Sequence, residues 1–120
     1  MRISHHASSP DVLILEANSG LNGQAISEVV GEIERRIDAG ATKLIVDCSE
    51  LGYVTSNGLA VLIGLHKALE AKGGQLKLAG LQARVARLLG ITRLDRVFGI
   101  YPELEQARAS FAATQGFAKE

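Results

Sequence analysis

An alternation between short apolar runs and helical repeats constrains the fold of this chain most strongly. Two of the runs, residues 11–17 and 43–48, have the length and branched side chains of buried strands. Between them, apolar residues recur at the three- and four-residue spacing of one helix face: Ile26, Val29, Val30, Ile33 and Ile37. A helix between two such strands predicts a right-handed parallel crossover, and therefore an α/β fold.

The rest of the chain continues this alternation. Asn22 is expected to cap the first helix and Gly40 to end it. An edge strand is expected at 2–7, before the first buried strand. After the second buried strand, a largely buried helix is expected at 59–72, ending at Gly73-Gly74, and a further strand at 75–79. The last elements are expected to be a helix around Val85, Leu88 and Leu89 closed by Gly90, a strand at 96–100, a helix begun by Pro102 with Leu104, Ala107 and Phe111 inside, and a loose end beyond Thr114.

Length and composition predict one globular domain. The 120 residues, of which 47% are hydrophobic and 22% charged, suffice for a single core. Thirteen basic residues balance thirteen acidic ones, so we expect no direct nucleic-acid binding and no attraction to anionic membranes. Four arginines are expected to form a solvated face: Arg84, Arg87, Arg93 and Arg96. One cysteine cannot form an internal disulfide, and no apolar stretch suits a signal peptide or a membrane span, which predicts a cytoplasmic location without membrane insertion.

The most informative stretch is 47–59, with the sequence DCSELGYVTSNGL. It resembles the signature of STAS domains, in which a strand ends in an acidic residue, a hydrophobic loop follows, and a Ser-x-Gly element opens the next helix. Asp47, Ser56 and Gly58 match those positions. The resemblance covers most of the chain, including the early strand with Gly20 and the segments 72–76 and 89–98. It implies a single STAS domain over residues 1–120, with a mixed sheet of four to five strands, about four helices and a flexible tail at about 115–120.

The resemblance also implies a function, that of a bacterial anti-sigma factor antagonist, a signalling protein that regulates transcription. Such a protein engages an anti-sigma factor serine kinase while its serine, here Ser56, is unmodified; phosphorylation ends the engagement and a phosphatase restores it. The implied partner-binding loop comprises Asp47, Gly52, Tyr53, Val54, Thr55, Asn57 and Gly58.

One position departs from the family pattern. Family members that are phosphorylated by an anti-sigma kinase commonly have Asp directly before the serine, where this chain has Thr55. Thr55 is therefore a neighbouring candidate acceptor. The departure also leaves open a second role, that of a STAS adaptor subunit that binds constitutively to a transporter ATPase or a signalling complex.

The residues around Ser56 allow two interpretations without the family. A serine that opens a helix lies beside backbone N–H groups without intrahelical acceptors, and these donors favour a phosphate there. Alternatively, Ser56, Thr55 or Asn57 is only the N-cap, a role that stabilises by about 1 kcal/mol. Asp47 either orders the loop or is a plain strand-end carboxylate. Gly58 either permits close approach of another backbone or packs as a small residue.

A serine at a strand–loop–helix turn also suggests a serine hydrolase, which we regard as a remote alternative. Val54 occupies the position where a nucleophile elbow has glycine, no histidine lies on a late loop, and no Gly-rich phosphate loop with its lysine is present. His5 and His6 would face opposite sides of a strand, and His66 is expected to be a core histidine with satisfied hydrogen bonds. Cys48 lacks zinc-ligand spacing and is expected to be a buried small hydrophobe. The sequence predicts no enzyme, metal or cofactor site.

Overall fold

The computed structural model describes residues 2–7, 9–18, 21 and 23–118. Strands and helices alternate along most of the described chain, which confirms the α/β class. Their order is β1 (Arg2–His5), β2 (Val12–Glu16), α1 (Gln24–Asp38), β3 (Lys43–Asp47), α2 (Ser56–Glu70), β4 (Gln75–Ala79), α3 (Ala83–Ile91), the 3₁₀ turn η2 (Leu94–Arg96), β5 (Gly99–Tyr101) and α4 (Leu104–Ala118).

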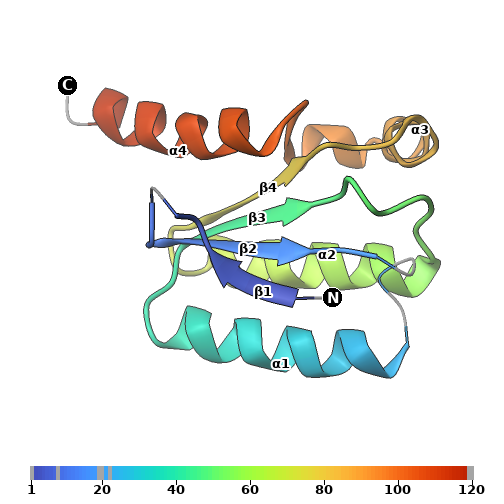
Figure 1. Ribbon diagram of the computed structural model, residues 1–120, viewed down its shortest axis with the longest axis horizontal. Helices are drawn as coiled ribbons and strands as arrows, with labels where there is room; N and C mark the ends of the chain where they lie inside the picture. The colour runs from blue at the N-terminus through green and yellow to red at the C-terminus, as the bar shows by residue number, and fades with distance from the viewer. Residues whose placement is uncertain (1, 8, 19–20, 22, 119–120) are drawn as a thin grey trace.

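The strands form one mixed sheet of five strands in the order β1-β2-β3-β4-β5 (Figure 1). β1 is antiparallel to β2, whereas the other neighbouring pairs are parallel. α1 joins β2 to β3 and α2 joins β3 to β4, so these pairs have the helical crossovers that parallel neighbours require. The expected mixed sheet with its helices is confirmed.

Each face of the sheet is covered by a different helical layer, because successive strand residues point to opposite sides. The face toward α1 and α2 carries most of the core, in which Leu44 and Leu78 pack with Leu65 (Figure 1). The face toward α4 carries a smaller cluster, in which Ile45 packs with Phe111. All six residues expected in the core are at most 3% exposed: Leu13, Ile45, Val46, Leu62, Leu65 and Leu78.

The ends of the first two helices differ slightly from the sequence prediction. The N-cap of α1 is Gly23 rather than Asn22, and both Asn22 and Gly20 lie outside the described residues. Gly40 follows α1 with a φ of 114°, a left-handed conformation that favours glycine after a helix. α2 starts at Ser56 instead of Leu59, because a side-chain cap from Thr55 lets the polar residues before Leu59 join the helix.

Three predictions in the C-terminal part are wrong in detail. Gly90 lies inside α3, since the chain turns away only at Arg93 with a φ of 62° and the Thr92 hydroxyl donates to Leu88 O. The last strand is shorter than 96–100 because residues 94–96 form η2. Pro102 precedes α4, whose first turn is closed when the Glu103 N–H donates to the Gln106 side chain.

The C-terminal end is helical as far as Ala118, so residues 115–118 continue α4. Residues 119 and 120 lie outside the described residues, and the flexibility of the tail stays a prediction. Within the described ranges, none of the helices combines the length and apolar character needed to cross a bilayer.

Candidate functional site

The loop between β3 and α2, residues 48–55, lies at the end of the sheet toward which the parallel strands point (Figure 1). Backbone hydrogen bonds fix its first half: the Cys48 N–H donates to Ala79 O at 2.8 Å, and the Leu51 N–H donates to Cys48 O at 2.9 Å. The Leu51 side chain is fully buried and anchors the loop in the core. The loop therefore leaves the sheet in a defined direction.

Asp47 orders the start of this loop. Its Oδ1 accepts a hydrogen bond from the Ser49 N–H at 3.1 Å, and Ser49 O in turn accepts from Gln82 Nε2 at 2.8 Å. Gln82 is the N-cap residue of α3, so this short chain of contacts ties the loop to the next helix. Of the two interpretations of Asp47, the structure favours the loop-ordering one.

Thr55 caps α2. Its backbone is extended, and its Oγ1 accepts a hydrogen bond from the Gly58 N–H at 3.0 Å, which satisfies one donor of the first turn. Ser56 is the first residue of the helix; its side chain is exposed, and its hydroxyl makes no hydrogen bond to another described residue. Asn57 is also exposed, whereas Gly58 is buried. Among the three N-cap candidates, the threonine has that role.

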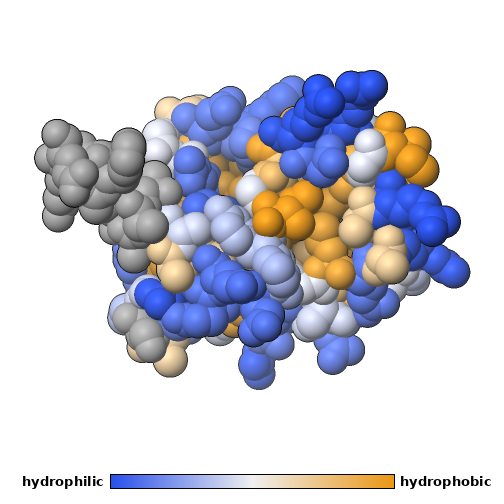
Figure 2. Space-filling model, turned by 90° about the horizontal axis from the view of Figure 1, so that it is seen from above, coloured by the Kyte–Doolittle hydropathy of each residue, from blue (hydrophilic) through white to orange (hydrophobic). Residues whose placement is uncertain are grey.

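An apolar groove of about 270 Å³ adjoins the loop and was not foreseen from the sequence. Tyr53 and Ile91 on its rim are 52% and 74% exposed. Its other lining residues are Val54, Arg84, Val85, Arg87 and Leu88. Figure 2 shows orange apolar side chains among blue polar ones at the end of the molecule where Figure 1 places α3. Two of the arginines expected on a solvated face thus border an apolar surface.

Gly52, Tyr53 and Val54 complete the predicted loop, and α3 supplies the second wall of the groove. The signal available for this wall was the pair of apolar residues Leu88 and Ile91, which are half-buried and exposed, respectively, on α3. Neither residue marked a groove by itself, because the second wall comes from a segment about 35 residues away in sequence, and such pairings depend on the tertiary fold.

Cys48 is fully buried at the start of the loop, as expected for a small hydrophobe. Burial first, and the neighbouring Asp47 second, raise the pKa of its thiol to about 12. The thiol therefore stays protonated at neutral pH and is no nucleophile in the folded protein.

The histidines lie away from Ser56. His5 and His6 face opposite layers, as predicted: His5 Nε2 lies 3.0 Å from Arg36 Nη1 of α1, and His6 Nε2 lies 3.4 Å from Glu105 Oε2 of α4. His66 was expected to be satisfied, and this is wrong, since its Nδ1 is buried without a hydrogen-bond partner in the described structure. The groups of His, Cys, Asp and Glu in the described ranges include none that could hold a metal ion.

Comparison with known proteins supports one family. A model of the STAS domain matches residues 6–107. A candidate anti-sigma factor antagonist of Thermotoga neapolitana is 30% identical over 98 residues, which are 81% of this chain and 87% of that protein.

Two solved structures share the fold. The anti-sigma factor antagonist SpoIIAA in its unphosphorylated form matches with a TM-score of 0.78 at 18% identity, over 93% of this chain and 97% of that chain. The STAS domain of a SulP transporter from Vibrio cholerae matches with a TM-score of 0.67 at 18% identity, over 89% of this chain and 82% of that chain. The family model spans most of the sequence and includes the loop and the start of α2, and so the chain belongs to the STAS domain family.

Proposed function

We infer that this protein is an anti-sigma factor antagonist that binds an anti-sigma factor serine kinase through the loop at α2 and is released when Ser56 is phosphorylated. A phosphatase would reverse the modification. Family membership and the names of the related proteins support this role. The single observation that carries the switch is the position of Ser56, exposed on the first residue of α2 and without a hydrogen bond to another described residue.

The start of α2 suits a phosphate electrostatically. Backbone N–H groups of the first helical turn lack intrahelical acceptors, and the helix dipole favours negative charge there. The first turn of α2 contains no acidic residue among those described, so a phosphate with about −1.5 to −2 charges meets no carboxylate on its own helix. We therefore expect phosphorylation of Ser56 to leave the fold intact and to act on the surface.

The two neighbouring hydroxyls are not equivalent acceptors. Thr55 Oγ1 holds the Gly58 N–H, and a phosphate on this oxygen would disturb the cap of α2. The Ser56 hydroxyl does not cap the helix, and this favours Ser56 as the phosphate acceptor. Threonine and aspartate are both good N-cap residues, so Thr55 preserves the helix start that Asp would provide while omitting its charge.

The adjoining groove supplies a surface that the modification can control. Tyr53 and Val54 of the loop line it together with Leu88 of α3, and Arg84 and Arg87 border it. A partner that places an apolar side chain in the groove and acidic groups near the arginines would be complementary. Added negative charge at Ser56 would repel such acidic groups, and a tenfold loss of affinity requires only about 1.4 kcal/mol.

The geometry argues against a hydrolase and supports a binding protein rather than an enzyme. His66 shares α2 with Ser56 but lies ten residues along it, about 15 Å at 1.5 Å per residue. A general base must come within about 3 Å of the hydroxyl proton, or act through one water. His5 and His6 are at the start of the chain and contact α1 and α4 instead.

The adaptor alternative remains distinct, and one observation favours it: the STAS domain of a SulP transporter has the same fold. An adaptor would use the same loop and groove but would bind its partner whether or not Ser56 carries charge. The two roles therefore differ in one measurable quantity, the sensitivity of partner affinity to modification of Ser56.

The test compares Ser56 with its exposed neighbour Asn57. The purified protein is incubated with ATP and each anti-sigma factor kinase of the same bacterium, sites are mapped by mass spectrometry, and affinities are measured by calorimetry. Ser56→Ala should block phosphorylation and keep binding, and Ser56→Asp should weaken binding at least tenfold. The matched control Asn57→Asp should weaken it less.

Two outcomes would contradict the switch. Phosphorylation of Ser56→Ala at the wild-type rate would place the acceptor elsewhere. Equal affinity of the wild type and Ser56→Asp would leave the constitutive adaptor as the better account. Rapid labelling of Ser56 by a fluorophosphonate probe would instead favour the hydrolase.

A further inference from the structure

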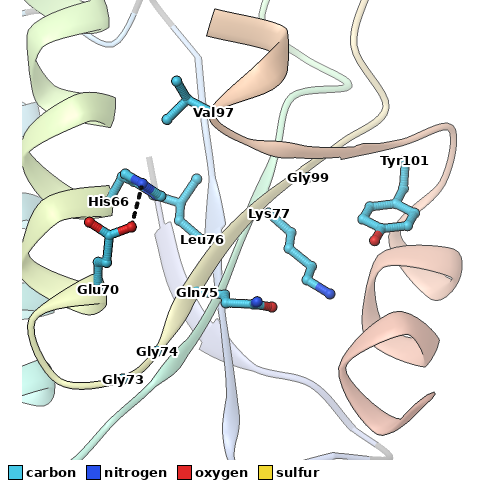
Figure 3. Close-up of a pocket in the computed structure, with 10 residues that line it drawn as sticks. All are labelled: His66, Glu70, Gly73, Gly74, Gln75, Leu76, Lys77, Val97, Gly99 and Tyr101. Carbon is cyan, nitrogen blue, oxygen red and sulfur yellow. Dashed lines mark ion pairs between the residues drawn. The ribbon is translucent and has the colours of Figure 1, made fainter. Parts of the chain in front are cut away.

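A second concave site lies at the far end of α2, along the part of the β4 edge that β5 leaves unpaired. β5 pairs with residues 77–79 of β4, so Gln75 and Leu76 extend past the edge strand. The cleft there has a volume of about 570 Å³, within the range of small-molecule sites. Figure 3 shows its walls: His66 and Glu70 on α2, and Lys77 and Tyr101 on the side toward α4.

Gly99 keeps part of this cleft open. It lines the cleft together with Gly73 and Gly74 and places no side chain between Lys77 and Tyr101. A Cβ on Gly99 would lie 3.4 Å from Lys77 Cγ and 3.3 Å from the Tyr101 ring, inside the region that the two side chains share. The local sequence therefore leaves a hollow beside β4 where a longer edge strand or larger side chains would fill it.

Lys77 is the unusual member of the cleft, because it is the buried charged residue of the described core, with 5% exposure. Its Nζ donates to Ser110 Oγ at 2.5 Å and lies 4.3 Å and 5.4 Å from the ring centroids of Phe111 and Tyr101. The ion pairs of the described chain do not include Lys77. Buried ammonium groups are ordinarily paired with a negative charge, and here a hydroxyl and two rings take that place.

The other polar side chains of the cleft lie on two sides of β4. The Gln75 amide and the Tyr101 hydroxyl, which can both donate, lie on the side of Lys77, whereas the His66 imidazole lies on the side of α2 (Figure 3). His66 Nε2 lies 3.6 Å from Glu70 Oε2, and its buried Nδ1 has no partner in the described structure. Glu70 is the one carboxylate in the lining, and its side chain is 71% exposed and therefore belongs to the rim.

We propose that this cleft binds a small organic anion, whose carboxylate or phosphate group pairs with Lys77 while its body lies along Gln75 and the unpaired backbone edge of β4. The site contains a buried cation, two possible donors on the same side of β4 and an open volume of suitable size. It lies at the opposite end of α2 from Ser56, so the proposal does not rest on the anti-sigma role.

The test is an amide NMR titration of the full chain with inorganic phosphate and, separately, with acetate, at constant ionic strength set with chloride. Saturable shifts should appear at Gln75, Leu76 and Gly99, and the more tightly bound probe identifies the oxyanion class. Lys77→Met keeps the aliphatic contacts and removes the charge; it should weaken binding at least tenfold. The matched control Lys67→Met removes an exposed lysine of α2 and should leave binding unchanged.

The wild-type titration alone can overturn the proposal. Shifts that are absent for both probes, or that spread over exposed lysines and arginines without saturation, would exclude a site. Unchanged binding by Lys77→Met would also exclude it, and if that variant does not fold, Lys77→Gln provides the same comparison. Ser56→Asp should bind either probe as the wild type does, so failure here is independent of failure of the switch.

Discussion

Replacement of Thr55 by alanine separates the structural role of one hydroxyl from the switch role that we propose for its neighbour, Ser56. Thr55→Ala removes the oxygen that accepts the Gly58 N–H at 3.0 Å, so a donor of the first turn of α2 loses its partner. Ser56→Ala removes a hydroxyl with no hydrogen bond to another described residue. The structure therefore predicts that two adjacent and chemically similar truncations have different effects on stability.

The magnitudes follow from the cap. Loss of an N-cap hydroxyl costs about 1 kcal/mol, with a range of about 0.5–2 kcal/mol. For 120 residues, an unfolding entropy of about 2.1 cal/mol/K per residue converts that loss into a decrease in Tm of about 4 °C. Ser56→Ala should change the free energy of unfolding by less than about 0.5 kcal/mol, because it deletes no hydrogen bond to another described residue and alanine favours helices.

Urea unfolding followed by circular dichroism at 222 nm measures both variants. The choice of probe is imposed by the sequence, which contains no tryptophan. Thr55→Ser and Thr55→Asp, which keep a capping oxygen, should stay within about 0.5 kcal/mol of the wild type. Equal losses for Thr55→Ala and Ser56→Ala would refute the reasoning, since Ser56 would then share the capping role and phosphorylation would disturb the helix.

Three further predictions concern the scaffold. Gly74→Ala should lower the free energy of unfolding by about 1–3 kcal/mol, because the added Cβ would meet Thr42 O at 2.3 Å. Gly64→Ala, whose Cβ would have no atom within 4 Å, should raise the free energy of unfolding by up to about 1 kcal/mol. Urea unfolding of the two variants compares these effects. Cys48, with its pKa raised to about 12, should react with a thiol reagent at pH 8 only after unfolding. Hydrogen bonds from Arg35 and Arg36 lower the pKa of Glu32 in the folded protein. The wild type should therefore be more stable than Glu32→Gln above pH 4.5, and this difference should vanish as the pH falls through the lowered pKa of Glu32. An acid titration of both proteins measures the difference.

The sequence was sufficient to predict the strands and helices that make up the layers of the fold, because apolar residues recur at regular spacings in most of them. The runs that became β2, β3 and β4 are bounded by turn residues, and the spacing in α1 leaves one apolar face. Boundaries were less predictable where capping decides them. Side-chain capping by Thr55 starts α2 early, but Ser56 and Asn57 are equally good capping residues, so the sequence alone could not fix the start. A left-handed Arg93 follows α3 past Gly90, and arginine is no signal for that conformation.

The candidate site was predictable only in part for a similar reason. A local motif marks Ser56 and its loop, but the groove requires α3 to pack beside Tyr53 and Val54. Likewise, Lys77 stands in an alternating strand pattern where an inward lysine cannot be told from an outward one. Its burial follows from α4, which covers that face of β4 and brings Phe111 over the ammonium group. Tertiary contacts therefore decide which polar residues matter.

The two ends of α2 have contrasting relations to the core. Leu62, Leu65 and Leu69 bury the middle of the helix, whereas Ser56 lies outside the buried surface at its start. A phosphate at Ser56 would thus remain in solvent, beside the N–H donors of the helix, and would not disturb the packing of the core. Its charge would therefore change the affinity for a partner and leave the stability of the fold unchanged. The ammonium of Lys77, by contrast, is inside the protein, and any anion that reaches it must leave water as well. Binding there should therefore be selective for anions that fit the cleft, while control at Ser56 should depend on charge more than on shape.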